Sequence, residues 1–305
     1  MPLVANTDVQ EEGELDELIA FMEDQKIDTS SEDDMMATAD VLRKISNNKS
    51  LVADVALKSI KERFQFDPSQ TSYGPQSIML HLDRRQNFYI RANFWPSQND
   101  HIFKASRAKT FFYHVPHDHN FNFMTVGHIG PGYESNYFEY EYEDVDGYVG
   151  ENVKLKFVER SSLKEGKVML YRAYRDVHDQ IPGESMSMSI NIMENTLRGA
   201  FMDQYEFSTE SGQIVDLINT IPARALLSIL ALSDTEESED LLMDVAKRHK
   251  SGYVRCIAVG AMASAKSDLD EARSVYAMGE VNDQEQVRGF CKNRMKQLDT
   301  LLVAE

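Results

Sequence analysis

Three histidines in the middle of the chain have the residue type and the spacing of a metal site. His117 and His119 are separated by Asp118, and on an extended strand residues two apart project from the same face. Both imidazoles can therefore reach one ion while Asp118 points away. A third ligand must come from another segment, and His178, which lies between two predicted strands, is the best candidate. Neutral imidazoles suit Fe(II), Mn, Ni, Cu or Zn, so the sequence predicts a metal site of His117, His119 and His178.

The segment that carries these histidines has the pattern of a series of short strands. Residues 67–210 are rich in aromatic and β-branched side chains, and turn signals at 130–132, 146–147 and 182–183 help to divide them. No helical pattern intervenes, which favours an antiparallel sandwich or a small barrel. The predicted strands are residues 77–82, 87–95, 109–114, 120–127, 136–143, 153–159, 168–174 and 185–193.

An acidic helical segment, residues 1–66, precedes the strands. Its first 40 residues hold 13 acids and one base, Lys26. Apolar residues recur at helical spacing between residues 14 and 65, and the acids at 32–34 favour the start of a helix that Ser30 or Ser31 could cap. The sequence indicates a solvated flank of short helices, with a docking surface for a basic partner as the alternative.

A second helical segment, residues 211–305, follows the strands, and it contains an internal similarity. The pattern that begins at Val254-Arg255 recurs 33 residues later at Val287-Arg288. Paired helices stacked at such a period bury a seam that one unit alone could not bury. The motif resembles HEAT-like helical repeats, and an ordinary helical bundle is the alternative. The whole chain is therefore predicted to be an α+β protein of three domains, 1–66, 67–210 and 211–305.

The histidine motifs resemble those of the cupin superfamily. Its first motif supplies an HxH pair followed by a hairpin with glycines, here His117 to His119 and then 127–132. Its second motif supplies a glycine, a strand and a lone histidine, here Gly166 and His178. The usual cupin glutamate, four or five residues beyond the pair, is absent, which points to the three-histidine group whose best-known member is cysteine dioxygenase. Over residues 77–195 the resemblance implies a jelly-roll β-barrel, bound Fe(II) and the use of O2.

The same resemblance implies a substrate-binding arginine. Residues 89–93 are similar to the strand that carries the arginine for the substrate carboxylate in that family, which makes Arg91 the candidate. Arg172 is a second candidate, because a guanidinium binds a carboxylate bidentately. Tyr174 is the predicted catalytic phenol, with Tyr171 and Tyr113 as alternatives. No cysteine lies in this segment, so the thioether-forming cysteine of the family has no counterpart.

Four further residues are weaker candidates for the metal. His114 lies three residues before His117 and is expected on the other face, and His128 falls in a predicted hairpin. Glu134 or Glu139 could complete a site of two histidines and one carboxylate. Glu139, however, belongs to a run in which acids alternate with Phe138, Tyr140 and Tyr142, which indicates a solvated face opposite a buried aromatic face.

The composition excludes several classes of protein. The formal net charge is −18, which repels phosphate backbones, so no nucleic-acid partner is expected. No run of 18 apolar residues and no basic, apolar leader are present, so neither a membrane span nor a secretory signal is expected. Two cysteines, Cys256 and Cys291, are too few for a disulfide framework and suit a cytoplasmic location.

The predicted function is a non-heme Fe(II)-dependent dioxygenase that acts with O2 on a small or peptide-linked substrate bearing a carboxylate, such as a thiol or amino acid. A metal- or ligand-sensing cupin that uses its helical repeats as a protein-interaction surface is one alternative, and a Zn- or Mn-dependent isomerase or hydrolase is another; nickel is a further candidate metal. The helical repeats could also form a homo-oligomer interface. A 2-oxoglutarate oxygenase is disfavoured, because residues 179–197 contain no lysine or arginine for the cosubstrate.

Overall fold

A computed structural model describes residues 2–61, 76–106, 108–145, 147, 149–219, 222–233, 235–249 and 251–304. The chain divides into two compact units. The first unit comprises Met1–Tyr140, Lys154–Thr196 and Glu206–Gly212, and the second comprises Glu141–Val153, Leu197–Tyr205 and Gln213–Glu305. The acidic N-terminal segment and most of the predicted β-rich segment thus belong to one unit.

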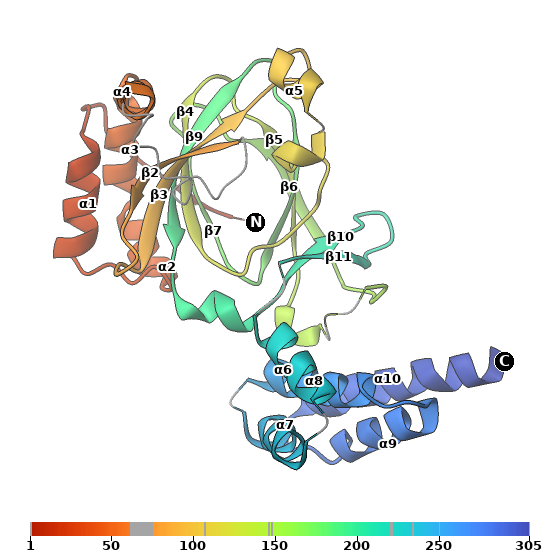
Figure 1. Ribbon diagram of the computed structural model, residues 1–305. Coiled ribbons are helices and arrows are strands. Elements are labelled where there is room, and N and C mark those ends of the chain that lie inside the picture. Colours follow the sequence, from red (N-terminus) through yellow and green to blue (C-terminus); the bar gives the residue numbers. More distant parts are fainter. Residues whose placement is uncertain are drawn as a thin grey trace. The chain divides into compact units, whose positions relative to one another are not determined.

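A six-stranded antiparallel sheet, which we call sheet A, forms the centre of the first unit (Figure 1). The strand Ser187–Glu194 pairs with Phe123–Ile129 on one side and with Phe88–Trp95 on the other, so the ladder of backbone hydrogen bonds is continuous across the middle of the sheet. In spatial order its strands are β1 (Leu3–Ala5), β7 (Val168–Tyr171), β4 (Phe123–Ile129), β9 (Ser187–Glu194), β3 (Phe88–Trp95) and β2 (Ser77–Leu82).

Sheet A is buried on both faces, and successive residues of its strands point alternately into the core on one face and the core on the other. On β9, Ile190 and Ile192 belong to a hydrophobic core shared with the N-terminal helices, whereas Ser189 and Asn191 project to the opposite face. That opposite face carries a second core of aromatic residues, including Tyr171. The helices therefore cover one side of the sheet, and the other side encloses an aromatic interior.

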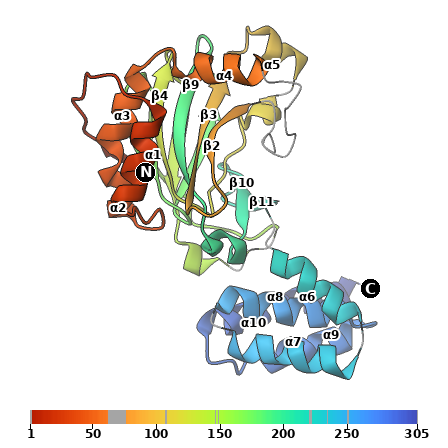
Figure 2. The same ribbon diagram turned by 60° about the vertical axis from the view of Figure 1, so that its left-hand side comes forward.

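The N-terminal segment forms short helices, as the sequence predicts, but these pack on sheet A and are not a solvated flank (Figure 2). Ser31 caps one of them, because its hydroxyl accepts a hydrogen bond of 3.3 Å from the amide of Asp34. The sequence reading misses β1, a short edge strand ahead of the helices. The helices are α1 (Leu15–Asp24), α2 (Glu32–Ala37), α3 (Ala39–Asn47) and α4 (Leu51–Lys61).

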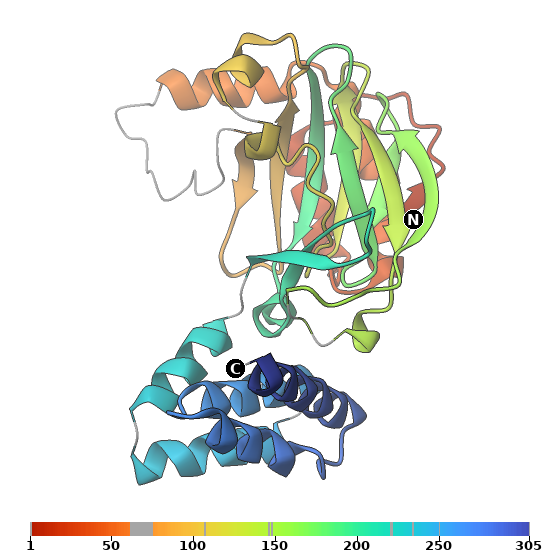
Figure 3. The ribbon, with the colours of Figure 1, turned by 90° about the vertical axis from the view of Figure 1, so that its right-hand side faces the viewer.

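A three-stranded antiparallel sheet, sheet B, forms the other wall of the aromatic interior, in the order β6 (Lys156–Ser162), β5 (Glu134–Glu139) and β8 (Asp176–Ile181) (Figure 3). A further two-stranded sheet joins β10 (Gln204–Phe207) and β11 (Ile214–Asn219). The predicted barrel is therefore observed as separate antiparallel sheets, and isolated bridges join His117 to His178 of β8 and to Glu206 of β10.

Several strand predictions need correction. Residues 77–82 form a strand as predicted, but 109–114 do not: after the short helix α5 (His101–Ala105) the chain forms a 3-10 turn, Ala108–Phe111. Phe112 and His114 then adopt positive φ angles of 56° and 57°, which no strand tolerates. Strand β8 was not predicted, because Asp179 and Gln180 interrupt its apolar pattern, and β10 and β11 were missed as well.

The second unit is mainly helical. Helix α8 (Gly252–Ser264) contacts each of the other four α-helices described in this unit. Nine of its residues are buried, including Arg255 and Cys256. The repeat interpretation stays a prediction. Cys256 and Cys291 are both buried, and neither forms a disulfide within the described residues. The other helices are α6 (Pro222–Leu232), α7 (Glu236–Arg248), α9 (Leu269–Gly279) and α10 (Glu285–Ala304). Within the described part of the chain, none of the helices has the length and apolarity needed to cross a bilayer.

Two glycines allow a sharp test of the turns in the first unit. Gly132 (φ 82°) and Gly166 (φ 78°) share a left-handed backbone, but a Cβ at Gly132 would lie 2.0 Å from the backbone carbonyl of Leu163, whereas at Gly166 it would meet only the mobile end of Arg43. We expect Gly132→Ala to lower the free energy of unfolding by about 3 kcal/mol or more, and Gly166→Ala by about 1–2 kcal/mol. Urea denaturation measures both, and equal losses would contradict the close approach to Leu163.

Candidate metal centre

Backbone pairing brings the two histidine motifs together. The amide of His117 donates to the carbonyl of His178 at 3.1 Å, and the amide of His178 donates back to the carbonyl of His117 at 3.0 Å, so the two residues form an antiparallel bridge. The carbonyl of His119 accepts from the amide of Tyr174 at 2.8 Å. The HxH segment is extended, as predicted, but it lies beside β8 as an isolated bridge and not within a regular strand.

The three imidazoles converge on one point. The Nε2 atom of His178 lies 3.0 Å from Nε2 of His119 and 3.2 Å from Nε2 of His117. One nitrogen from each of the three rings lies within 4.8 Å of the others. Nitrogens bound to a common ion at about 2.1 Å are separated by roughly 3.0–3.4 Å. The two separations from His178 fall in this range, so the cluster can present three nitrogen ligands to one side of a metal ion.

The protonation of these rings also favours a cation. The Nδ1 atom of His117 lies 2.6 Å from the carbonyl of Val115, which fixes the proton on Nδ1 and leaves a lone pair on Nε2. His178 Nε2 faces both other Nε2 atoms, and a neutral imidazole can donate only one proton from that atom. The three facing nitrogens thus cannot all be satisfied by hydrogen bonds among themselves, whereas a metal ion would satisfy all three.

Burial keeps the three rings neutral. All three side chains are almost completely enclosed, with exposed fractions of 3% for His117, 8% for His119 and 2% for His178. Desolvation lowers the pKa of His117 to about 4. Desolvation also holds the pKa of His119 and that of His178 well below the usual value, with a smaller contribution from neighbouring charges. Neutral imidazole is the form that binds metals.

Asp118, between the two histidines, points away from the convergence point. Its carboxylate is completely buried and accepts a hydrogen bond of 2.6 Å from the hydroxyl of Tyr140, at the end of sheet B. A buried carboxylate needs such partners to remain charged. Asp118 and Tyr140 therefore fix the backbone between the two ligands and hold their orientation.

Aromatic rings enclose the histidines. The ring of His119 packs edge-to-face on Phe123, at 4.8 Å between centroids, and lies 5.0 Å from Phe121. Tyr171 stacks on Phe123 at 4.3 Å and lies 4.9 Å from His178, and its hydroxyl is 2.9 Å from that of Tyr137. The surroundings are mostly apolar but carry phenol groups, which lowers the local dielectric and limits access of water.

Arg91 lies on the wall of this interior. It is on β3, opposite Asn191 in the register of β9, and alternates with Ile90 and Ala92, which belong to the core beneath the helices. Its guanidinium is near enough to the histidines for its charge to contribute to the lowered pKa of His119. The predicted substrate-binding arginine and the histidine cluster thus share the inner face of the first unit.

The other two predicted site residues have different surroundings. Arg172 donates to both carboxylate oxygens of Asp176, at 3.0 and 2.7 Å, and to Glu139 at 2.8 Å, and only 10% of its side chain is exposed. Tyr174 has a positive φ angle of 61°, and its hydroxyl donates to the carbonyl of Asn120 at 2.8 Å. These contacts tie Arg172 to β8 and Tyr174 to the segment after the HxH motif, and the predicted roles of the two residues in substrate binding and catalysis stay predictions.

The weaker ligand candidates lie outside the histidine cluster. His114 is exposed, and His128 is buried beneath α3, where its Nδ1 atom faces the carbonyl of Ser46 at 3.0 Å. Glu139 pairs with Arg172, and Glu134 pairs with Arg160. In the described residues, the only group of three or more histidine, cysteine or acidic side chains placed to hold a metal is His117, His119 and His178.

No protein-family model matches the chain, and no curated protein matches it. Solved structures that match include procruciferin, an 11S globulin from Brassica napus (12% identity, TM-score 0.27, 57% of this chain and 36% of that chain). A cupin-like protein from Thermotoga maritima (12%, 0.23, 46% and 92%) and the hydroquinone 1,2-dioxygenase PnpCD (10%, 0.27, 44% and 76%) also match. This chain thus spans about a third of the length of procruciferin.

Metal content tests the assignment of the ligands. We expect His119→Ala to remove nearly all of the bound transition metal, because two imidazoles give a much weaker site than three. His114→Ala serves as the matched control and should keep the wild-type metal content, since His114 is exposed and outside the cluster. Elemental analysis of both proteins after gel filtration gives the stoichiometry. Equal metal content in the two variants would show that the metal binds elsewhere.

The contact between Tyr140 and Asp118 gives a second test. Tyr140→Phe leaves the buried carboxylate with one donor fewer, which should lower the free energy of unfolding by about 1–3 kcal/mol. Because the ligand orientation loosens, metal affinity should fall by roughly 10–100-fold. Tyr113→Phe is the control, because that buried hydroxyl donates to Pro96. Competition with a chromogenic chelator measures the affinities, and an equal loss in both variants would contradict the positioning role.

Proposed function

We propose that the protein is a non-heme Fe(II)-dependent dioxygenase that acts on a small substrate bearing a carboxylate. The observation that carries the proposal is the convergence of three buried, neutral imidazoles, with no carboxylate in the group among the residues that the structure describes. Bound Fe(II) would supply O2 chemistry, and three protein ligands leave it open positions. His117, His119 and His178 would hold the ion.

The residues around the cluster are suited to binding the substrate. Arg91 would hold the substrate carboxylate through two parallel hydrogen bonds, which orients the rest of the molecule toward the histidines. Phe121, Phe123 and Tyr171 would exclude water from the reacting atoms. The ring of Tyr171 lies 4.9 Å from that of His178, and its phenol, which is linked to that of Tyr137, would supply a hydroxyl at the site.

A zinc- or manganese-dependent isomerase or hydrolase would use the same three ligands, because neutral imidazoles accept several metals. A metal sensor would bind the ion without turnover. The identity of the bound metal distinguishes the isomerase or hydrolase from an oxygenase. A search for O2 consumption distinguishes the metal sensor from an oxygenase.

The test is metal analysis of protein purified without oxygen, followed by a screen for O2 uptake with thiols, amino acids and diketones. We expect about one iron per chain and O2 uptake with a carboxylate-bearing substrate. His178→Ala should lose both. Stoichiometric zinc in place of iron, or bound iron without O2 uptake across the screen, would reject the dioxygenase.

The role of Arg91 has its own test. With the substrate found in that screen, Arg91→Gln should raise KM by roughly 10–100-fold, because a charged hydrogen bond to the carboxylate is lost. Its control is Arg85→Gln, an arginine whose side chain is 89% exposed on the turn before β3. Iron content should be unchanged in both variants. An unchanged KM in Arg91→Gln would assign the carboxylate to another cation.

A further inference from the structure

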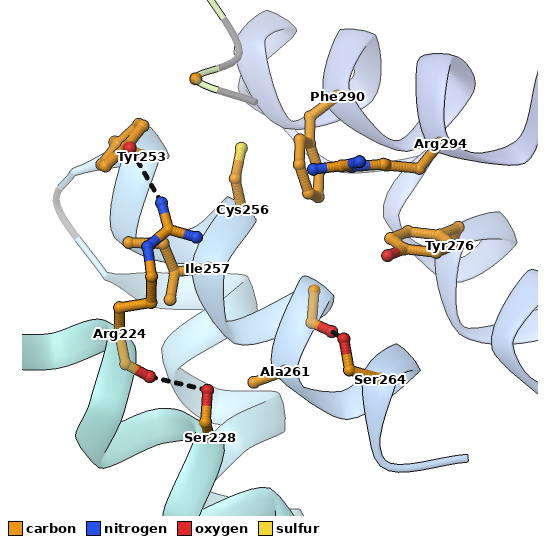
Figure 4. Close-up of a pocket in the computed structure, with 12 residues that line it drawn as sticks. Arg224, Ser228, Tyr253, Cys256, Ile257, Ala261, Ser264, Tyr276, Phe290 and Arg294 are labelled. Carbon is orange, nitrogen blue, oxygen red and sulfur yellow. Dashed lines mark hydrogen bonds between the residues drawn. The ribbon is translucent and has the colours of Figure 1, made fainter. Parts of the chain in front are cut away.

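A separate pocket of about 300 Å³ lies within the second unit, between helices α6, α8, α9 and α10 (Figure 4). Its size is at the lower end of the range for small-molecule sites. All of its lining residues belong to the second unit, so it shares no residue with the histidine cluster.

Small side chains form the floor of the pocket. Cys256, Gly260 and Ser264 recur at intervals of four on one face of α8, next to Ala261. A Cβ at Gly260 would have Phe290 as its nearest neighbour, at 3.6 Å, so this position opens into space that a larger side chain would fill. The floor therefore lets a flat molecule approach the helix closely.

Two arginines provide the charge. Arg224 on α6 and Arg294 on α10 project from opposite sides of the pocket (Figure 4). Arg224 is held by Asp203 at 2.5 Å and by the hydroxyl of Tyr253 at 3.0 Å, and Arg294 lies over the ring of Phe290 at 5.3 Å. Both guanidiniums are thus fixed in advance, which reduces the entropy lost when a ligand binds.

The charges of the pocket define the class of ligand. Among the described residues no acidic side chain lines it, and the buried Asp203 pairs with Arg224 from behind. The Nε atom of Arg224 is buried and, among the described residues, has no hydrogen-bond partner. A buried donor without an acceptor is costly, and a carboxylate oxygen would satisfy it. A guanidinium and a carboxylate match in shape and form parallel hydrogen bonds, which favours a carboxylate as the anionic group of the ligand.

The apolar part of the pocket indicates the rest of the ligand. Tyr276 and Phe290 pack edge-to-face at 6.0 Å between centroids, and both are largely buried. Tyr253 closes the end near Arg224, so three aromatic rings surround the flat floor of α8. Aromatic rings bind other rings by stacking or by edge-to-face packing.

We propose that this pocket binds a small aromatic monocarboxylate, with the carboxylate at Arg224 and the ring over α8 between Arg294 and Tyr276. The site is independent of the metal centre and of the function proposed for it.

Calorimetric titration of the full chain with sodium benzoate tests the proposal, with benzamide as the neutral analogue. We expect one saturable benzoate site per chain and at least tenfold weaker binding of benzamide. The titration is repeated after chelation of metals and with His119→Ala, and both should leave benzoate affinity unchanged. This separates the pocket from the histidine cluster, where Arg91 could also attract a carboxylate.

Variants locate the site. Arg294→Gln and Arg224→Lys should each weaken benzoate binding at least tenfold, the second without leaving Asp203 unpaired, and Gly260→Leu should abolish binding by filling the pocket. Arg248→Gln is the charge-matched control, because that side chain is 80% exposed on α7 and its loss should leave benzoate affinity unchanged. Circular dichroism confirms that each variant is folded. The proposal is overturned if benzoate does not bind, if benzamide binds equally well, or if inorganic phosphate binds more tightly than benzoate. It is also overturned if the folded pocket variants bind benzoate with unchanged affinity.

Discussion

The reciprocal pair of backbone hydrogen bonds between His117 and His178 is the contact on which the metal centre depends. It joins segments that are about 60 residues apart and sets their register. Because strand side chains alternate, a shift of one residue would turn His178 to the opposite face of β8 and remove a ligand. The same register places Tyr137 opposite His178, and so brings the phenol network beside the site.

The two-sided burial of sheet A explains why that contact can be held rigidly. One face packs on the N-terminal helices through residues such as Ile190 and Met124, and the other presents Tyr171 and Phe123 to the histidines. A strand that is fixed by apolar packing on one side can carry polar groups on the other without loss of order. The acidic N-terminal segment is thus more than a solvated flank, because its apolar residues complete the core of the first unit.

The second unit has its own buried polar network. Asp203 is completely buried and contacts both Arg224 and Tyr253, and Tyr205 donates to Tyr253 at 3.1 Å. Burial raises the pKa of Tyr253 and that of Tyr205 above the usual value, so both remain protonated donors at neutral pH. The network holds one arginine of the proposed pocket in place, which gives the helices a role beyond packing.

By itself, the sequence determined the alternation of apolar residues, and hence the antiparallel α+β architecture and the shared face of His117 and His119. These are local properties with a period of two residues. Only the tertiary structure decided that the sheets remain separate, that Arg172 pairs with Asp176 and Glu139, and that the hydroxyl of Tyr174 binds the carbonyl of Asn120. Those outcomes depend on partners brought together by folding, and a pattern within one segment does not specify which carboxylate or carbonyl will face a given side chain.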